Sequence, residues 1–135
     1  MPGTLGPQAA GQPWTTVGFW MIAVGAAYLL LIAARAFVNP KGFAAYLGLP
    51  LSDPADTGFV SVYAARSVFI GLLGVALLFR RDMAVLSVFA LLAVLMPVTD
   101  AILVNRAKAG AGTVLRHSVV AVFLFVTSIL LWRGI

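Results

Sequence analysis

Four side chains able to take part in acid–base or electrostatic chemistry lie in or beside long apolar stretches of the chain. Asp100 lies within LMPVTDAILVNR, Tyr63 and Arg66 lie within YAARSVFIGLLG, and His117 lies just inside the last apolar stretch. A carboxylate and an imidazole can exchange protons with a substrate near neutral pH, and a guanidinium can stabilise developing negative charge. These residue types predict acid–base chemistry without a cofactor, provided that the fold brings them together.

The composition decides what kind of fold must position these side chains. Of the 135 residues, 62% are hydrophobic and only 10% are charged, and the mean hydropathy is +1.06. A soluble domain has roughly half its residues apolar and about a quarter charged. Too few polar residues remain here to cover a surface facing water. The sequence therefore predicts an integral membrane protein, with residues 1–135 forming a single membrane domain.

Four apolar segments cover most of the chain, at about residues 15–37, 55–80, 83–105 and 114–133. Each is close to the roughly 20 residues that a helix needs to cross the hydrocarbon core of a bilayer. Only helices and closed barrels satisfy their backbone in lipid, and these segments lack the alternation of barrel strands. The predicted fold is all-α, a four-helix transmembrane bundle that makes the protein multi-pass.

The connection after the first segment, NPKGFAAYLGLPLSDPADTG, is long enough to hold structure of its own. Phe43, Tyr46 and Leu47 share one face at helical spacing, which predicts a short interfacial helix or lid. Asp53 is predicted to cap the second long helix, with Pro54 at its first position.

Two shorter connections also contain predicted helix caps. Asp82 is predicted to cap the third long helix, and Thr113 is predicted to cap the fourth.

An even number of crossings places both termini on one side of the membrane, where Trp14 and Trp132 suit the headgroup layer. We call this side the terminal face, and we call the opposite side, with the first and third connections, the loop face. The net charge is +5, but the basic residues lie singly or in pairs at segment ends. This distribution fits membrane topology and anionic headgroups better than a nucleic-acid stripe. If Arg35 and Arg116 are counted, the positive-inside rule places the loop face in the cytoplasm.

The polar residues within the helices gather in one half of the membrane. At the helical rise per residue, Asp100 lies about 6 Å inside the loop face and Arg66 about 10 Å inside it. Tyr63 lies one turn before Arg66, His117 lies in the first turn of the last helix, and Arg35 ends the first helix. Each long helix therefore contributes a polar side chain to the same half, which predicts a shared site.

Pro97, three residues before Asp100, predicts a kink in the third long helix. It lacks a backbone donor, and its ring clashes with the carbonyl group of Ala93. Gly71 and Gly74 in the second long helix predict close packing nearer the membrane centre. Close packing at the centre and divergence above it predict a cup that opens toward the loop face, with the first connection as its lid.

The candidate site has a structural alternative at each position. Arg66 and Asp100 could form only a salt bridge between helices, since charged groups inside a membrane usually pair. His117 could bond a backbone carbonyl, Arg35 could extend to the interface, and Tyr63 could only satisfy its hydroxyl. The predicted catalytic residues are Asp100, His117 and Arg66, and the predicted substrate-binding residues are Tyr63, Arg35, Tyr28 and Asn105.

No metal or other cofactor is predicted. The chain has one histidine and no cysteine, too few ligands for a protein metal site, and it has no nucleotide or flavin motif.

Several short stretches resemble the small bacterial four-helix membrane proteins of the DoxX-like group, near its uncharacterised families. They are RAFVNPKGFAAYLGLP, YAARSVFIGLLG, PVTDAILV and RH, and they span roughly residues 35–117. The resemblance implies a four-helix fold in the bacterial inner membrane, and a group that includes accessory redox subunits and proteins of unknown role. The positions that it marks are Arg35, Pro40, Tyr63, Arg66, Asp100 and His117.

The sequence thus predicts a pocket with a polar bottom that binds a lipophilic small molecule and catalyses its isomerisation, cyclisation or epoxide opening. One alternative is a non-catalytic subunit that binds lipid or quinone, or a small transport-related protein that self-associates. Another is an assembly partner of a larger membrane enzyme, docked through Gly25, Ala26 and Ala27. Beyond the small molecule, the expected partners are membrane lipids and either further copies of the chain or that larger enzyme.

Overall fold

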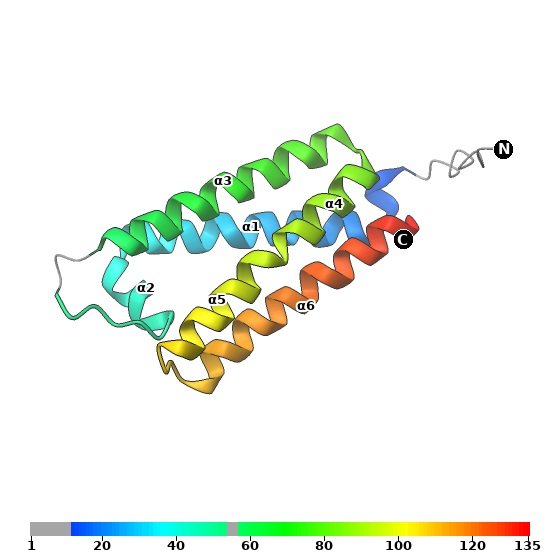
Figure 1. The fold of residues 1–135 in the computed structure, drawn as a ribbon. Helices are drawn as coiled ribbons and strands as arrows, with labels where there is room; N and C mark the ends of the chain where they lie inside the picture. Colours follow the sequence, from blue (N-terminus) through cyan, green and yellow to red (C-terminus); the bar gives the residue numbers. More distant parts are fainter. Residues whose placement is uncertain (1–11, 54–56) are drawn as a thin grey trace.

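The computed structural model describes residues 12–53 and 57–135, which form helices joined by short connections, with no strand among them (Figure 1). A short 3-10 turn, η1, precedes the first helix. Helices α4 and α5 together form one membrane-length segment, so four segments are long and apolar enough to cross a membrane. The predicted all-α four-helix fold is confirmed. The elements are η1 (Pro13–Thr15), α1 (Val17–Val38), α2 (Pro40–Tyr46), α3 (Gly58–Arg80), α4 (Met83–Ala93), α5 (Leu95–Arg106) and α6 (Ala111–Arg133).

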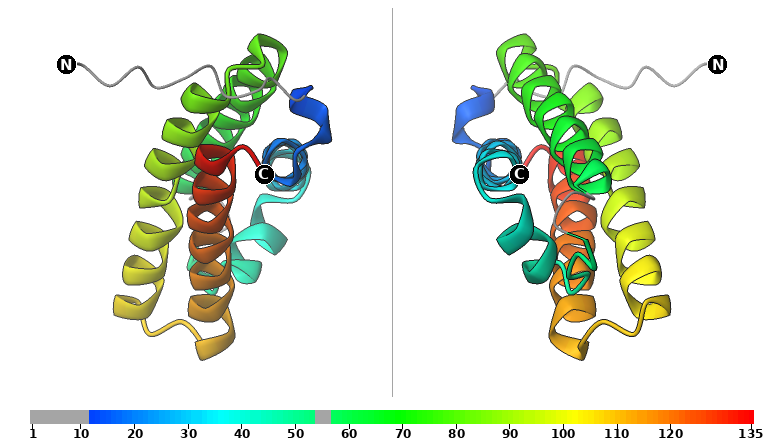
Figure 2. Two further views of the ribbon diagram at one scale, coloured as in Figure 1. Left: turned by 90° about the vertical axis from the view of Figure 1, so that its right-hand side faces the viewer. Right: turned by 90° about the vertical axis from the view of Figure 1, so that its left-hand side faces the viewer.

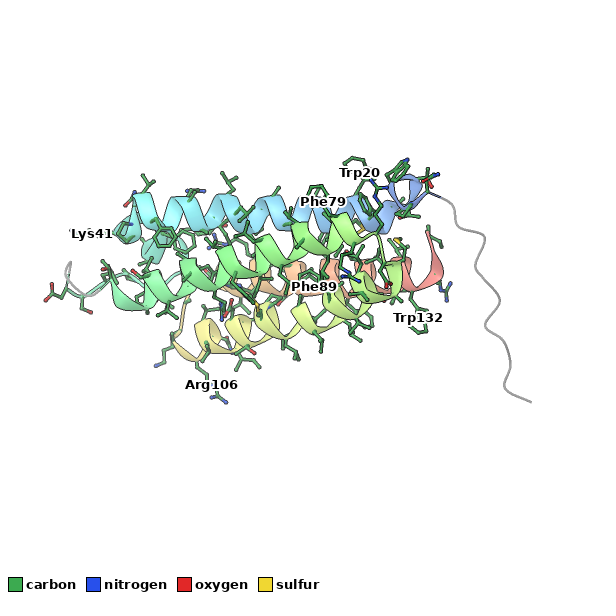
Figure 3. The ribbon with its side chains drawn as sticks, turned by 90° about the horizontal axis from the view of Figure 1, so that it is seen from above. Trp20, Lys41, Phe79, Phe89, Arg106 and Trp132 are labelled. Atoms are coloured by element: carbon green, nitrogen blue, oxygen red, sulfur yellow. The ribbon has the colours of Figure 1, made fainter. Side chains whose placement is uncertain are left out.

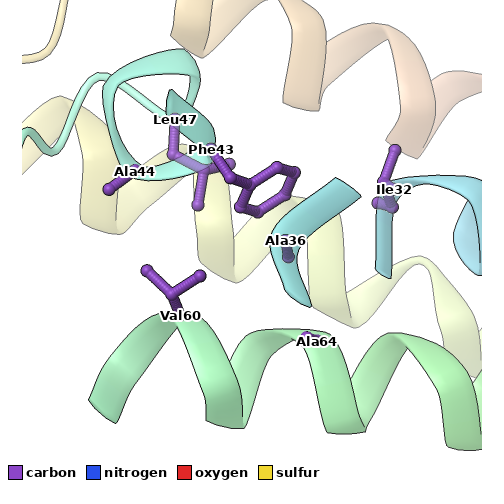
Figure 4. Close-up of a cluster of buried hydrophobic side chains, with 7 residues drawn as sticks. All are labelled: Ile32, Ala36, Phe43, Ala44, Leu47, Val60 and Ala64. Carbon is purple, nitrogen blue, oxygen red and sulfur yellow. The ribbon is translucent and has the colours of Figure 1, made fainter. Parts of the chain in front are cut away.

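The predicted short helix of the first connection is α2, and it packs inward. Asn39 accepts a hydrogen bond at Oδ1 from the backbone N–H of Gly42 and so caps α2, with Pro40 at the first helical position. Phe43 and Leu47 are buried in the bundle rather than in interfacial lipid. Figure 4 shows the cluster that α2 forms with α1 and α3: Ile32, Ala36, Phe43, Ala44, Leu47, Val60 and Ala64.

The helix caps differ in part from the prediction. Asp82 accepts a hydrogen bond from the backbone N–H of Val85 at 3.1 Å, so its predicted cap is confirmed. The Thr113 cap is wrong, because α6 already begins at Ala111 with Gly110 before it. The Asp53 cap is also wrong, because α3 begins at Gly58, and the proline predicted to follow Asp53 lies outside the described residues.

Helices α1 and α3 form one closely packed pair. A Cβ atom added at Gly71 would lie 2.9 Å from Leu30 Cγ, and one added at Gly74 would lie 3.4 Å from Ala26 Cβ. The predicted role of these glycines in close packing is therefore confirmed. Ala26 is buried against α3, which corrects its assignment to a docking surface for an assembly partner.

Helices α4 and α5 pack against α6 to form the second pair. Ser87 Oγ donates to the Ser128 carbonyl oxygen at 2.9 Å, and Ser128 Oγ donates to the Ser87 carbonyl oxygen at 3.0 Å. Both serines are buried, so their hydroxyl groups are satisfied inside the membrane segment.

The two pairs meet near the terminal face and diverge toward the loop face, where α2 lies between them (Figures 1 and 2). At the terminal face α1 is in direct contact with the end of α6: Gly18 lies against Leu131, and its N–H donates to the Ile135 carbonyl oxygen at 3.0 Å. Figure 3 shows Lys41 and Arg106 at the loop end of the bundle and Trp132 at the other end. The bundle is thus wedge-shaped and wider toward the loop face.

The third membrane segment is interrupted close to the site of the kink that Pro97 predicts. Helix α4 ends at Ala93 and α5 begins at Leu95, and the Val94 N–H donates to the Leu91 carbonyl oxygen at 3.3 Å. Pro97 is buried and has no N–H to donate to the Ala93 carbonyl group, so the regular pattern is interrupted one turn before it.

Candidate functional site

A cavity of about 330 Å³ lies inside the wedge and is lined by all six α-helices. Its deeper part is apolar and includes Ile22, Gly74 and Phe89, and a Cβ atom added at Gly74 would lie 3.5 Å from Phe89 Cε1. Its loop-face end is covered by Phe43 of α2 and by Leu47, which directly follows α2. The polar side chains that line it are Tyr28, Tyr46, Tyr63, Asp100, Arg116 and His117.

The cavity does not open toward the loop face, as the predicted cup would. The loop-face end is closed by α2, which therefore occupies the position predicted for a lid. The exposed lining residues instead lie on α1 and α6, on the side of the wedge between these two helices: Val24, Tyr28, Arg116 and Val119.

Arg66 and Asp100 form an ion pair between α3 and α5. Arg66 Nη2 donates to both carboxylate oxygens, at 3.2 Å from Oδ1 and 3.1 Å from Oδ2. The Tyr63 ring lies beneath the guanidinium, with 5.0 Å from Arg66 Cζ to the ring centroid. Arg66 Nε is buried and has no hydrogen-bond partner among the described residues. The pair holds the Asp100 carboxylate in place and connects the two halves of the wedge.

A second cavity of about 200 Å³ lies beside this pair, between α3 and α5. Arg66 lines this cavity and not the larger one, so it reaches a ligand in the larger cavity only through Asp100. The residues that line both cavities, and so form the wall between them, are Leu47, Tyr63, Asp100 and His117.

His117 lies in the second turn of α6, beside Asp100 in the wall between the cavities. Within the described part of the chain, its imidazole makes no hydrogen bond to a backbone carbonyl group or to Asp100. The direct bond of an Asp–His dyad is therefore not formed in this structure. Both side chains nevertheless face the same ligand-sized space.

A second cluster of polar side chains surrounds Tyr46 at the loop-face end of the larger cavity. Arg116 Nη2 donates to the Tyr46 carbonyl oxygen at 2.7 Å and to Thr113 Oγ1 at 3.0 Å. The guanidinium carbons of Arg116 and Arg35 lie 4.0 and 5.6 Å from the Tyr46 ring centroid. Burial raises the pKa of the Tyr46 hydroxyl, but Arg116 and Tyr28 beside it outweigh burial and lower the pKa below its usual value. Arg35 contacts the Tyr46 ring but lines neither cavity.

The sequence did not assign site roles to Arg116 and Tyr46. Tyr46 lies three residues after Phe43 on α2, so the two share a face and both line the cavity. Arg116 directly precedes His117 near the start of α6, and this neighbouring position could have indicated a site role for Arg116.

Asn105 lies apart from the other predicted site residues. It is exposed and lines neither cavity. On a helix, the neighbours of Asp100 on the same face are three and four residues away, and these are Leu103 and Val104. Asn105 is one residue further and points away from the wall, so the structure does not bring it to the site.

Tyr28 from α1 and Tyr63 from α3 do line the larger cavity, as do Asp100 and His117. Between residues 12–53 and 57–135, no cluster of three or more histidine, cysteine or acidic side chains is placed to hold a metal ion.

Comparison with known proteins identifies a family to which this chain is similar. The family described as "Domain of unknown function (DUF4267)" has a model that matches residues 25–131. This range includes the polar residues that line the two cavities and at least part of each membrane-length segment. No curated protein and no solved structure matches the chain. The match covers well over half of the sequence, and the chain therefore belongs to the DUF4267 family.

Proposed function

We propose that this DUF4267 protein binds a lipophilic small molecule in the larger cavity and catalyses its rearrangement by acid–base chemistry. The observation that carries the proposal is the convergence of Tyr63, Asp100 and His117 on one end of an otherwise apolar cavity. Its volume of about 330 Å³ lies within the range of about 300–1,000 Å³ that is typical of small-molecule sites. Such pockets commonly combine apolar walls with a few convergent polar groups.

The contacts support a division of roles in the wall between the cavities. The His117 imidazole has no hydrogen-bond partner among the described residues and is the group that takes and returns a proton. Asp100 is held by Arg66 as a carboxylate beside the imidazole, where its charge stabilises the imidazolium form. Tyr63 can donate a hydrogen bond that orients the ligand.

The reaction classes that fit these roles need no oxidant or cofactor. In an isomerisation or cyclisation, a proton leaves one atom of the substrate and a proton returns to another, so the composition is unchanged. In epoxide opening by water, protonation of the ring oxygen accompanies attack by water, and the product contains one water more.

One observation favours a second candidate function. Arg66 and Asp100 pair directly with each other between α3 and α5, as in a structural salt bridge. The cavity would then hold a lipid or quinone for a non-catalytic subunit, which is the role that the resemblance to the DoxX-like group supports.

We also propose from the basic residues and this resemblance that the loop face is the cytoplasmic side of a bacterial inner membrane.

Extraction of the purified protein with organic solvent, followed by chromatography and mass spectrometry, tests the catalytic proposal. Wild type and His117→Gln are compared, with Asn105→Gln as a control on an exposed residue of the same end. The catalytic proposal expects His117→Gln to retain an isomer of the wild-type compound, or a form lacking one water. The same compound in all three proteins would establish binding without catalysis, and no compound in any of them would argue against the site itself.

A further inference from the structure

The larger cavity has an opening toward the lipid. Val24 on α1 is 62% exposed and Val119 on α6 is 58% exposed, although both line the cavity. Tyr28 and Arg116, also exposed, lie on the same two helices nearer the loop face. Lining residues from α2, α3, α4 and α5 are buried or half-buried, so the exposed side of the cavity is the one between α1 and α6.

Both edges of this opening change from polar to apolar with depth. On α6, Arg116 is followed at one-turn intervals by Val119 and Phe123, all of which line the cavity. On α1, which runs in the opposite direction, the exposed lining residues are Tyr28 and, one turn deeper, Val24. The opening therefore has the same order of polarity as a lipid in that leaflet, with its head toward the loop face and its chain toward the membrane centre.

The polar end of the opening carries an uncompensated positive charge. Asp100, the acidic side chain that lines this cavity, pairs with Arg66 and not with Arg116. Arg116 donates hydrogen bonds through Nε and Nη2 and also interacts with the Tyr46 hydroxyl, and its exposed side chain lines the cavity, where an anionic ligand can reach it. Arg35 lies over the ring of Tyr46 and adds a second positive charge to this end.

We propose that the ligand is a single-chain amphiphile with an anionic head, and that it reaches the cavity sideways from the bilayer between α1 and α6. Its head binds Arg116 beside Tyr28 and Tyr46, and its chain lies in the apolar part of the cavity. The volume of about 330 Å³ is near the lower end of the range for small-molecule sites, about 300–1,000 Å³, and so suits one chain rather than two. This inference rests on the proposed binding function and names its ligand class and its route.

Head recognition is tested with a fluorescent polyene fatty acid and the alcohol of the same chain, titrated into the protein in vesicles of zwitterionic phospholipid. Wild type is expected to bind the acid about tenfold or more tightly than the alcohol, the factor typical of a charge-assisted hydrogen bond. Arg116→Gln should lose this preference. Arg106→Gln, an exposed charge at the same face that lines neither cavity, should keep it.

Arg116 also holds the backbone of Tyr46, so its loss can disturb α2 as well as the head site. Arg116→Lys separates these effects, because it keeps the charge but not the fork of donors. It should retain most of the preference for the acid, and melting temperatures should show that all variants fold. Equal affinity of wild type for acid and alcohol, or a preference that persists in Arg116→Gln, would overturn the inference and leave the proposed function standing. If wild type binds neither probe, this inference fails, while the extraction of the purified protein decides the proposed function separately.

The route is tested by stopped-flow association of the same fatty acid. Val119→Trp should narrow the opening and slow association and dissociation several-fold. Val122→Trp is the matched control, because Val122 is 62% exposed on α6 but does not line the cavity. Val62→Trp, which narrows the second cavity between α3 and α5, should leave the rates unchanged.

Three outcomes would overturn the lateral route. Equal rates in Val119→Trp and Val122→Trp would place access elsewhere, and slow rates in Val62→Trp would place it between α3 and α5. A dimer in native mass spectrometry that Val119→Trp dissociates would show that a second copy of the chain covers the opening instead.

Discussion

Arg66 holds Asp100 through a single nitrogen. Nη2 of the arginine lies 3.2 and 3.1 Å from the two oxygens of the carboxylate, while Nε is buried without a partner among the described residues. A fork-shaped pair would use two nitrogens and would be stronger. The observed pair therefore fixes the position of Asp100 between the two cavities but leaves one buried donor unsatisfied.

Asp100→Asn tests what this pair contributes. The change leaves the Arg66 cation without its counter-charge, and breaking a buried pair costs about 3–5 kcal/mol of unfolding free energy. The Arg66 side chain is 36% exposed, so we expect a loss at or below the lower end of that range. The double variant Arg66→Leu, Asp100→Leu should recover much of the loss, measured as melting temperature in one detergent.

The same variants separate a structural role from a catalytic one. If Asp100 supports the chemistry, the double variant is stable but processes the co-purified lipophile about 10²–10⁴-fold more slowly, as is typical when acid–base catalysis is lost. A double variant that is both stable and fully active would remove Asp100 from the catalytic site.

Pro97→Ala should restore a backbone donor to the Ala93 carbonyl group and make α4 and α5 one continuous helix. We expect equal or higher thermal stability, because the interrupted hydrogen bond is regained. The third membrane segment should also straighten, narrow the wedge and weaken binding of the fluorescent fatty acid. Protection from hydrogen exchange of the backbone amide that the substitution introduces checks the first effect. Unchanged binding alongside a protected amide would mean that the break does not shape the cavity.

Gly25→Leu should fill the larger cavity. A Cβ atom at Gly25 would meet Phe123 Cε1 at 3.8 Å, an ordinary contact, so a leucine can extend into the cavity without displacing the backbone. We expect binding of the fluorescent fatty acid to fall while the melting temperature is kept. Gly112→Leu is the matched control, because a Cβ atom there meets nothing within 4 Å. Equal binding by the two variants would place the ligand outside this cavity.

Cysteine labelling tests the topology. Single cysteines at Lys41, Arg81 and Lys108 should react with a membrane-impermeant reagent in two groups. Positions 41 and 108 lie at the loop face and position 81 at the terminal face, so the first two should be alike and the third different. In intact bacterial cells, labelling of position 81 alone would support the proposed orientation, and labelling of 41 and 108 alone would reverse it.

The sequence by itself determined the elements of this protein. The length and apolar character of the four segments required helices in a membrane, because unpaired backbone groups are too costly in lipid. The local chemistry of Asp82 and Pro97 determined a cap and a break, since both depend on atoms within one turn of the helix. Helical rise alone also placed Asp100, Arg66 and His117 in the same half of the membrane.

The tertiary structure decided which side chains meet, because each helix can rotate and tilt without changing its own hydrogen bonds. Packing turned Ala26 toward α3 and left Asn105 exposed, although each had been assigned to a functional surface. It also folded α2 into the wedge, which brought Tyr46 against Arg116 across a long separation in sequence. The divergence of the two helix pairs, and with it the cavity and its opening between α1 and α6, depends on such contacts between helices, which no single segment specifies.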